Sequence, residues 1–224
     1  MIQFVHVGKC AGSSIRCALD ELDINCKEFH CNDANVALSS QLKANTSSYY
    51  LVSVRDPIKR FISAFYWDYY EKRILNDLYG PNDFWKKIYE VFTSPNELAE
   101  SLTSQDFFLK EMAQNYIYNS HLHAHYTLSW YFSVDNVKFL NNENCHVVRT
   151  ERADEDFLTF LKKIGANSSI FNGLAREKQD YKHSINNYNI ALSELGKHNL
   201  ENAYFEDYII LDGFFRKGLI DKRY

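Results

Sequence analysis

Glycine and proline are scarce in this chain of 224 residues, which contains 8 glycines and 3 prolines. Tight turns and flexible linkers depend on these two residue types, so their scarcity favours long helices with few tight turns between them. No stretch rich in proline, glycine and serine divides the chain, and its length is enough to bury a sizeable core. We therefore expect a single domain over residues 1–224.

Long apolar runs and paired cysteines are absent as well. No segment is apolar enough over sufficient length to predict a membrane span, and none resembles a signal peptide. The cysteines are odd in number and lack the spacing of a disulfide framework, which favours reduced thiols and a cytoplasmic location. They are Cys10, Cys17, Cys26, Cys31 and Cys145.

Neither sign of charge dominates. The chain has 25 lysines and arginines against 29 aspartates and glutamates, a formal net charge of −4. Such a chain has no general attraction for nucleic acid, and we expect no nucleic-acid partner. An acidic polymer would need a local basic groove, and solvated charges on helix surfaces are the alternative for its candidate residues. The candidates are Lys59, Arg60, Lys72, Arg73, Lys86 and Lys87.

The most informative segment is residues 4–15, with the sequence FVHVGKCAGSSI. An apolar run ends in a turn of small residues, and a helical pattern follows. A strand, a tight turn and a helix N-terminus together form a phosphate-binding geometry, because the first N–H groups of the helix point outward. The residues placed to meet a phosphate are Lys9, Ala11, Gly12, Ser13 and Ser14.

This segment lacks the features of the two commonest nucleotide-binding loops. A Walker A loop has its lysine after the second glycine, whereas Lys9 precedes Gly12 here. The dinucleotide pattern G-x-G-x-x-G fails because Gly8 and Gly12 are the only glycines in the turn. The alternative to a phosphate loop is an ordinary strand–helix turn with an incidental lysine.

Residues 49–63 show a second transition from a strand to a helix, similar to that of residues 4–15. Residues 49–54 form a continuous apolar run, which is typical of a buried parallel strand. Asp56 suits the N-cap of a helix and Pro57 suits its first position. Arg55 is then expected at the carboxyl end of a strand, where open α/β sheets bind ligands, with Ser63 about two turns into the helix.

The chain as a whole alternates between strands and helices, which predicts an α/β fold with a parallel sheet covered on both faces. Gly165 suits the position just after a helix. The segment at about 57–140 is expected to be a largely helical insertion. Strands are predicted near residues 2–7, 26–30, 50–55 and 145–150, and helices near residues 13–22, 57–77, 82–92, 105–118, 154–164 and 187–211.

Both motifs resemble those of the carbohydrate sulfotransferases, which use 3′-phosphoadenosine 5′-phosphosulfate (PAPS). Residues 7–15 resemble their 5′-phosphosulfate loop, P-K-T-G-G-T-S-L, and residues 55–65 resemble their 3′-phosphate motif, R-D-P-x-x-R-x-x-S. With residues 145–158, which are similar to a later strand and helix, the resemblance is nearest the heparan sulfate and uronyl 2-O-sulfotransferases. Gly8 and the pair Cys10-Ala11 depart from the family pattern, so one side-chain donor to the phosphosulfate is expected to be missing.

The resemblance implies a P-loop-like three-layer sandwich and an enzyme that moves a sulfuryl group in line from PAPS to a hydroxyl of a carbohydrate or glycoside. The adenosine 3′,5′-bisphosphate (PAP) is the product, and no metal is required. Lys9 would contact the bridging oxygen of the phosphosulfate. The loop residues would hold the 5′-phosphate, and Arg55 and Ser63 the 3′-phosphate. Because Golgi members carry an amino-terminal anchor, a trimmed Golgi-lumenal catalytic domain is the alternative to a cytoplasmic enzyme.

A general base is needed to deprotonate the acceptor hydroxyl, and His30 is the candidate. It ends an alternating run that predicts a short strand, and the 2-O-sulfotransferases have their proposed base in about this place. The alternatives are a merely structural His30 or a base from the cluster of His121, His123 and His125. That cluster has no paired cysteines or H-E-x-x-H motif beside it, so no metal site is expected.

Two other functions stay open. One is a catalytically inactive sulfotransferase-fold protein that binds a nucleotide or glycan. The other is a kinase-like phosphotransferase, which the missing Walker lysine and the lack of a clear Mg²⁺-binding acid disfavour. Arg216-Lys217-Gly218 resembles a short 3′-phosphate motif of cytosolic sulfotransferases, and a solvated basic tail is its alternative.

Overall fold

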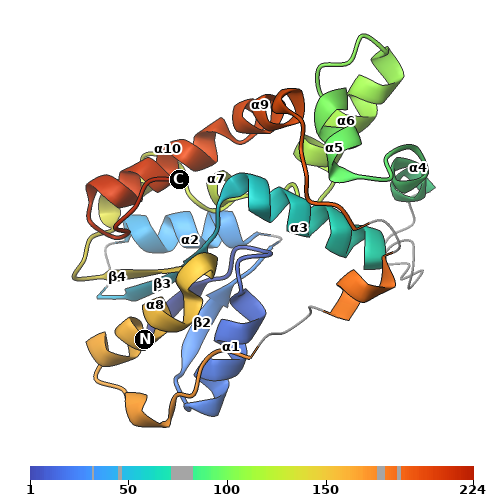
Figure 1. Ribbon diagram of the computed structural model, residues 1–224. Helices are drawn as coiled ribbons and strands as arrows, with labels where there is room; N and C mark the ends of the chain where they lie inside the picture. The colour runs from blue at the N-terminus through green and yellow to red at the C-terminus, as the bar shows by residue number, and fades with distance from the viewer. Residues whose placement is uncertain (32, 45–46, 72–82, 176–179, 186–187) are drawn as a thin grey trace. The chain divides into compact units, whose positions relative to one another are not determined.

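A computed structural model describes residues 1–31, 33–44, 47–71, 83–175, 180–185 and 188–224 (Figure 1). The chain divides into two compact units. Unit 1 comprises Met1–Asp56, Thr127–Glu177 and Glu206–Tyr224, and unit 2 comprises Pro57–Tyr126 and Lys178–Phe205. That the chain is one domain stays a prediction.

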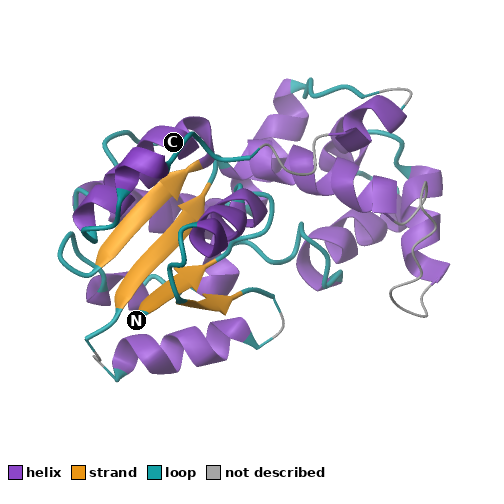
Figure 2. Ribbon diagram, turned by 90° about the horizontal axis from the view of Figure 1, so that it is seen from below, coloured by secondary structure: helices purple, strands orange, loops and turns teal. Residues whose placement is uncertain are grey.

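Unit 1 is built on a parallel sheet (Figure 2). Its described strands have the order β2-β1-β3-β4. The register places Ile2 opposite both Cys26 and Tyr49, and Tyr50 opposite Cys145. The predicted α/β class and its central parallel sheet are confirmed. The strands are β1 (Ile2–Val5), β2 (Cys26–Phe29), β3 (Tyr49–Val54) and β4 (Cys145–Arg149).

Helices cover both faces of this sheet and give unit 1 three layers (Figure 1). On one face lie α1 (Gly12–Glu21) and α8 (Ala153–Lys163). The other face carries α2 (Ala34–Lys43), α7 (Leu128–Tyr131) and α10 (Phe205–Arg216). The core between the sheet, α1 and α8 is apolar throughout, and burying each large side chain in it contributes roughly 1.5–3 kcal/mol. Its buried members include Phe4, Ile15, Leu19, Leu51, Val148, Phe157 and Phe160.

The connection from β2 to β3 contains α2, a helix that the sequence patterns did not predict. Only Leu38 and Leu42 are buried along it, so its hydrophobic periodicity is weak. Parallel strands nevertheless need a crossover, usually a helix, because a short hairpin cannot join them. From β1 the chain moves to β2 on one side, and from β2 it crosses to β3 on the other side of β1. Because both crossover connections have the same right-handed sense, α1 and α2 lie on opposite faces of the sheet.

The described part of unit 2 is helical and contains no strand. Local signals start two of its helices: the side chain of Ser94 accepts a hydrogen bond from the N–H of Glu97, and that of Asp106 accepts from Phe108 and Leu109. Its helices are α3 (Pro57–Tyr69), α4 (Asp83–Val91), α5 (Pro95–Ser101), α6 (Phe107–Asn119) and α9 (Glu194–Ala203). Four short 3₁₀ helices complete the elements of the described chain. Of these, η2 (Asn136–Phe139), η3 (Thr150–Arg152) and η4 (Ser168–Ile170) belong to unit 1, and η5 (Asp180–Ser184) belongs to unit 2.

Several predicted helix limits were wrong. The helix predicted over 187–211 is two helices, α9 and α10, because the backbone leaves helical geometry at Tyr204 (φ −107°, ψ 23°). Residues 188–193 precede α9 and are not helical. Helices α5 and α7 were missed because they are too short to show periodicity. The helix predicted over 57–77 begins at Pro57 as expected and its α-helical part ends at Tyr69, while residues 72–77 lie outside the described residues.

The sequence predicted neither a membrane-spanning helix nor a disulfide framework. No helix in the described ranges is both long and apolar enough to cross a membrane. All five cysteines lie within those ranges and none forms a disulfide.

The C-terminus of α8 confirms the role predicted for Gly165. This residue has a left-handed backbone with φ 71°. The N–H of Ala166 donates to the carbonyl of Leu161 at 2.9 Å, and that of Gly165 to Lys162 at 3.2 Å. Both bonds are those of a Schellman turn, which depends on the left-handed residue.

Replacing Gly165 with alanine is expected to lower the free energy of unfolding by about 1 kcal/mol, because an L-residue is strained in this conformation. A Cβ here meets no atom within 4 Å, so strain rather than a clash is the cause. Urea denaturation measures the loss. Gly165→Asn is the matched control and is expected to lose less, since asparagine tolerates the left-handed region. Equal losses for both variants would contradict this explanation.

Candidate functional site

The turn between β1 and α1 has an unusual backbone. Lys9 and Ala11 are both left-handed, with φ 66° and 60°. Each costs an L-residue roughly 1–2 kcal/mol, and such strain clusters at functional sites. Between them Cys10 is buried, and its N–H donates to the carbonyl of Val7 at 3.3 Å, which closes the turn.

Helix α1 begins without a side-chain cap. Its N-cap residue is Ala11, and the N–H of Ile15 donates to the carbonyl of Ala11 at 3.0 Å. The N–H groups of Gly12, Ser13 and Ser14 therefore precede the intrahelical hydrogen bonds. The helix dipole adds positive potential at the same end. The start of α1 thus offers backbone donors and a field that suit an anion.

The imidazole of His6 occupies the space that a side chain at position 12 would need. A Cβ added to Gly12 would lie 1.8 Å from Cδ2 and 2.1 Å from Nε2 of His6. Only glycine fits here while His6 keeps this position. The room that the small residue was predicted to leave for a phosphate is, at Gly12, filled by this ring. The edge of His6 that carries Nε2 therefore lies beside the start of α1.

Two residues at the end of β2 hold His6 in place. Nδ1 of His6 lies 2.5 Å from Oε1 of Glu28, and its ring stacks on that of His30 with centroids 4.0 Å apart. The hydrogen bond with His6 is the main cause that lowers the pKa of Glu28 from its ordinary value of 4.5. Glu28 is thus a carboxylate at neutral pH, and it orients the imidazole toward the loop.

His30 follows β2 and is exposed. Its Nδ1 lies 2.8 Å from the backbone carbonyl of His6. A carbonyl oxygen only accepts, so Nδ1 carries the hydrogen and Nε2 of the neutral ring carries the lone pair. Nε2 lies 3.5 Å from the thiol of Cys31. This tautomer is the one that a general base requires, with its accepting nitrogen at the carboxyl edge of the sheet.

Arg55 follows β3, the strand beside β1. Its Nη1 donates to the carbonyl of Lys9 at 3.3 Å, which ties the two loops together. Among the described residues this is the only hydrogen bond of its guanidinium, which has five N–H donors, and no carboxylate pairs with it. The remaining donors are available to a ligand.

Arg149, at the end of β4, contrasts with Arg55. Its guanidinium bonds to Asp156 through Nε and Nη2 and to Asp221 through Nη1. The hydrogen bonds with Asp156, and then those with Asp221, raise the pKa of Arg149. Two carboxylates thus neutralise this cation, and its role is structural.

The structure brings most of the predicted residues to one edge of unit 1. Lys9, His30 and Arg55 follow β1, β2 and β3, and the other loop residues, Ala11, Gly12, Ser13 and Ser14, form the start of α1. Ser63 lies on α3 and belongs to unit 2. His121, His123 and His125 belong to unit 2 as well and follow α6.

The prediction that Arg60 lines a basic groove was wrong. It is 1% exposed, and its Nη1 and Nη2 donate to the carbonyls of His123 and Ala124 at 2.6 and 3.3 Å. A guanidinium buried in this way cannot line a surface for an acidic polymer.

Arg216-Lys217-Gly218 closes α10. Gly218 is left-handed with φ 68°, and its N–H donates to the carbonyl of Phe215 at 2.9 Å. The carbonyl of Lys217 accepts from Asn142, which precedes β4. The motif therefore lies at the opposite edge of the sheet from Arg55.

His6 and Glu28 are the site residues that the sequence analysis missed. Both had a detectable signal. His6 is a titratable residue inside the apolar run at the end of the first strand. Glu28 precedes His30 by two residues, which places the two on the same face of a strand.

Comparisons of the chain with protein-family models, with curated proteins and with solved structures found no match.

Gly12→Ala is expected to lower the free energy of unfolding by about 2 kcal/mol, because the new Cβ overlaps the imidazole of His6. The same change made in a His6→Ala background should cost less, with a coupling free energy of at least about 1 kcal/mol. Denaturant unfolding of the single and double variants gives this coupling. Additive losses would show that the two residues do not compete for the same space.

Proposed function

We propose that this protein is a PAPS-dependent sulfotransferase that transfers a sulfuryl group to a carbohydrate hydroxyl. One observation carries the proposal: the uncapped start of α1 with Lys9, and the guanidinium of Arg55, follow two adjacent parallel strands. The chain leaves β1 for a strand on one side, while β3 lies on the other. At such switch points open α/β sheets bind their ligands. Two cationic loops suit a donor that carries phosphate at both its 5′ and 3′ positions.

The loop residues divide between the two phosphates of the donor. The N–H groups at the start of α1 and the hydroxyl groups of Ser13 and Ser14 hold the 5′-phosphate, as in a P-loop-like fold. Arg55 holds the 3′-phosphate, and the contact expected from Ser63, which belongs to unit 2, stays a prediction. The resemblance of residues 7–15 and 55–65 to the family motifs supports this division.

Sulfuryl transfer breaks the bond between sulfur and the bridging oxygen of the donor and forms a bond from sulfur to the acceptor oxygen. Negative charge grows on the departing phosphate of PAP. Lys9 and the backbone donors stabilise that charge, and losing one such fixed donor typically slows a reaction about 10²–10³-fold. Nε2 of His30 takes the proton of the acceptor hydroxyl. His6, held by Glu28, positions both His30 and the loop.

The first test is nucleotide preference. PAP is expected to raise the unfolding temperature more than ATP–Mg²⁺ at equal concentration, because only PAP carries a 3′-phosphate. A ligand at 100 times its Kd stabilises a protein by about 2.7 kcal/mol, which is easily measured. Lys9→Met and Arg55→Met should each weaken PAP binding by about tenfold or more, since each removes a charge-assisted contact.

Lys43→Met is the matched control, because Lys43 is exposed at the end of α2. Its PAP affinity should equal that of the unchanged protein. A larger shift with ATP–Mg²⁺ than with PAP would contradict the proposal and favour a phosphotransferase.

The second test separates binding from turnover. His30→Ala is expected to slow PAP release from PAPS with a glycoside acceptor at least about 100-fold, because a general base contributes 10²–10⁴-fold. Its PAP affinity should stay unchanged. His198→Ala replaces another exposed histidine and should leave turnover intact. Unchanged turnover in His30→Ala would remove it from the mechanism, and PAP binding without turnover on desulfated polysaccharides or glycosides would favour an inactive binding protein.

A further inference from the structure

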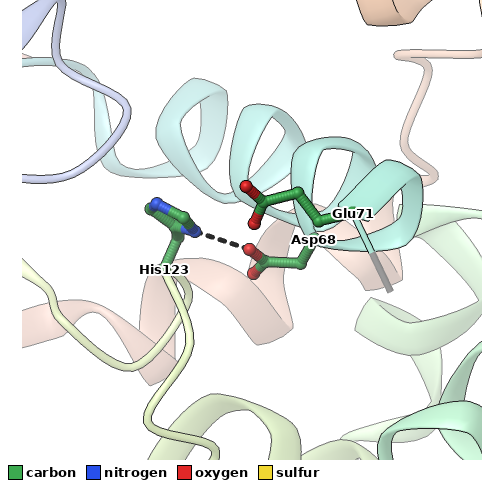
Figure 3. A group of neighbouring side chains, drawn as sticks. All are labelled: Asp68, Glu71 and His123. Carbon is green, nitrogen blue, oxygen red and sulfur yellow. Dashed lines mark hydrogen bonds and ion pairs between the residues drawn. The ribbon is translucent and has the colours of Figure 1, made fainter. Parts of the chain in front are cut away.

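A second cluster of titratable side chains lies within unit 2. It consists of Asp68, Glu71 and His123, and one ligand atom from each lies within 4.8 Å of the others. Asp68 is in the last turn of α3 and Glu71 follows one turn later, so the two share a face. Figure 3 shows both carboxyl groups directed toward the imidazole of His123.

Asp68 is an unusually buried carboxylate. Its side chain has no exposed surface, and its Oδ1 lies 2.5 Å from Nδ1 of His123. Within the described chain His123 is the only charged partner of Asp68, and it is charged only when protonated. Buried charges in proteins are paired or coordinate metals. Next to a second carboxyl group, Glu71, this site favours a bound cation.

Two tyrosines fix the orientation of Asp68. The hydroxyl of Tyr116 donates to Oδ2 of Asp68 at 3.3 Å, and that of Tyr89 donates to Tyr116 at 3.4 Å. Both tyrosines are completely buried, so packing fixes these two hydroxyl groups. The hydroxyl of Tyr116 thus occupies Oδ2, and Oδ1 stays directed at His123. Such outer contacts around ligand carboxylates are a regular part of metal sites.

The backbone that carries His123 is held just as firmly. Arg60 donates to the carbonyls of His123 and Ala124, and the hydroxyl of Tyr204 lies 3.5 Å from the carbonyl of Ala124. The buried guanidinium thus fixes the turn from which the imidazole projects. A ligand set held by packed neighbours changes little when it binds an ion.

We propose that Asp68, Glu71 and His123 bind a divalent transition-metal ion, with Zn²⁺ as the preferred one. One imidazole nitrogen and two carboxylate oxygens form a three-ligand set that leaves a position for water. In a tetrahedral site with bonds of 2.0–2.2 Å the ligand atoms lie about 3.4 Å apart, so the three groups need only small side-chain rotations. The ion takes the place of the hydrogen between His123 and Asp68. The imidazole ligand favours Zn²⁺ over Mg²⁺.

The sequence did not predict this site because its ligands come from distant segments. The absence of a metal site was expected from the lack of a paired motif near His121, His123 and His125. His121 and His125 have ring centroids 5.1 Å apart and do not belong to the cluster. The partners of His123 are instead Asp68, in the last turn of α3, and Glu71, just after that helix.

Isothermal titration calorimetry with the chelator-treated full chain tests the proposal. We expect one Zn²⁺ per chain, with weaker binding of Mn²⁺ and still weaker binding of Mg²⁺. Glu71→Gln and His123→Gln should each weaken Zn²⁺ binding by at least about 100-fold, more than the 10–100-fold that loss of an outer contact costs. Both side chains are partly exposed, so both variants should fold, and circular dichroism checks this.

His121→Gln is the matched control, because it removes a histidine two residues away that lies outside the cluster. Its Zn²⁺ affinity should stay within about threefold, since it holds no ligand atom. Substitution with Co²⁺ gives a second readout, and its visible absorption should disappear in Glu71→Gln. The proposal is wrong if the unchanged chain binds no Zn²⁺, if both cluster variants keep full affinity, or if only His121→Gln loses it.

Discussion

The central place of β1 in the sheet determines the candidate site. β1 pairs with β2 on one side and with β3 on the other, so three loops leave the sheet side by side. The N–H of His6 still donates to the carbonyl of Phe29 at 3.0 Å, which extends the pairing one residue beyond β1. That extra bond places His6 beside His30 before the chain turns into α1. Since parallel strands put their carboxyl ends at one edge, residues far apart in sequence meet there.

Three arginines, Arg149, Arg60 and Arg55, differ in the groups that their guanidinium charges contact. Arg149 is held by two carboxylates and Arg60 by two backbone carbonyls, and both are buried. Removing one member of a buried charge pair costs about 3–5 kcal/mol, so such arginines hold segments together. Arg55 has no carboxylate partner among the described residues. An arginine of this kind, with no carboxylate partner in the described part of the chain, suits an external anion.

Much of unit 1 could be predicted from the sequence because its signals are local. Apolar runs indicated β1 and β3, and an alternating run indicated β2. The family resemblance of residues 145–158 indicated β4, and Pro57 and Gly165 marked a helix start and a helix end. Helix α2 was not predicted, because its sequence has little hydrophobic periodicity and only the parallel pairing of the strands requires a helix there. The contact between His6 and Gly12 and the approach of His123 to Asp68 also escaped, since each depends on how distant segments pack. The helix break at Tyr204 could not be predicted, because no glycine or proline stands beside it in the sequence.

The division of the chain between the two units has a consequence for the order of folding. β1, β2 and β3 with their two crossover helices form one continuous stretch, Met1–Asp56, whose pairings are local in sequence. β4 pairs with β3 only after the intervening segment, residues 55–144, has been spanned. Closing a flexible loop of about ninety residues costs on the order of 4 kcal/mol in chain entropy. Early compaction of the helices within that segment shortens the loop, so the rate at which the sheet acquires its last strand depends on helices that contribute nothing to its hydrogen bonds.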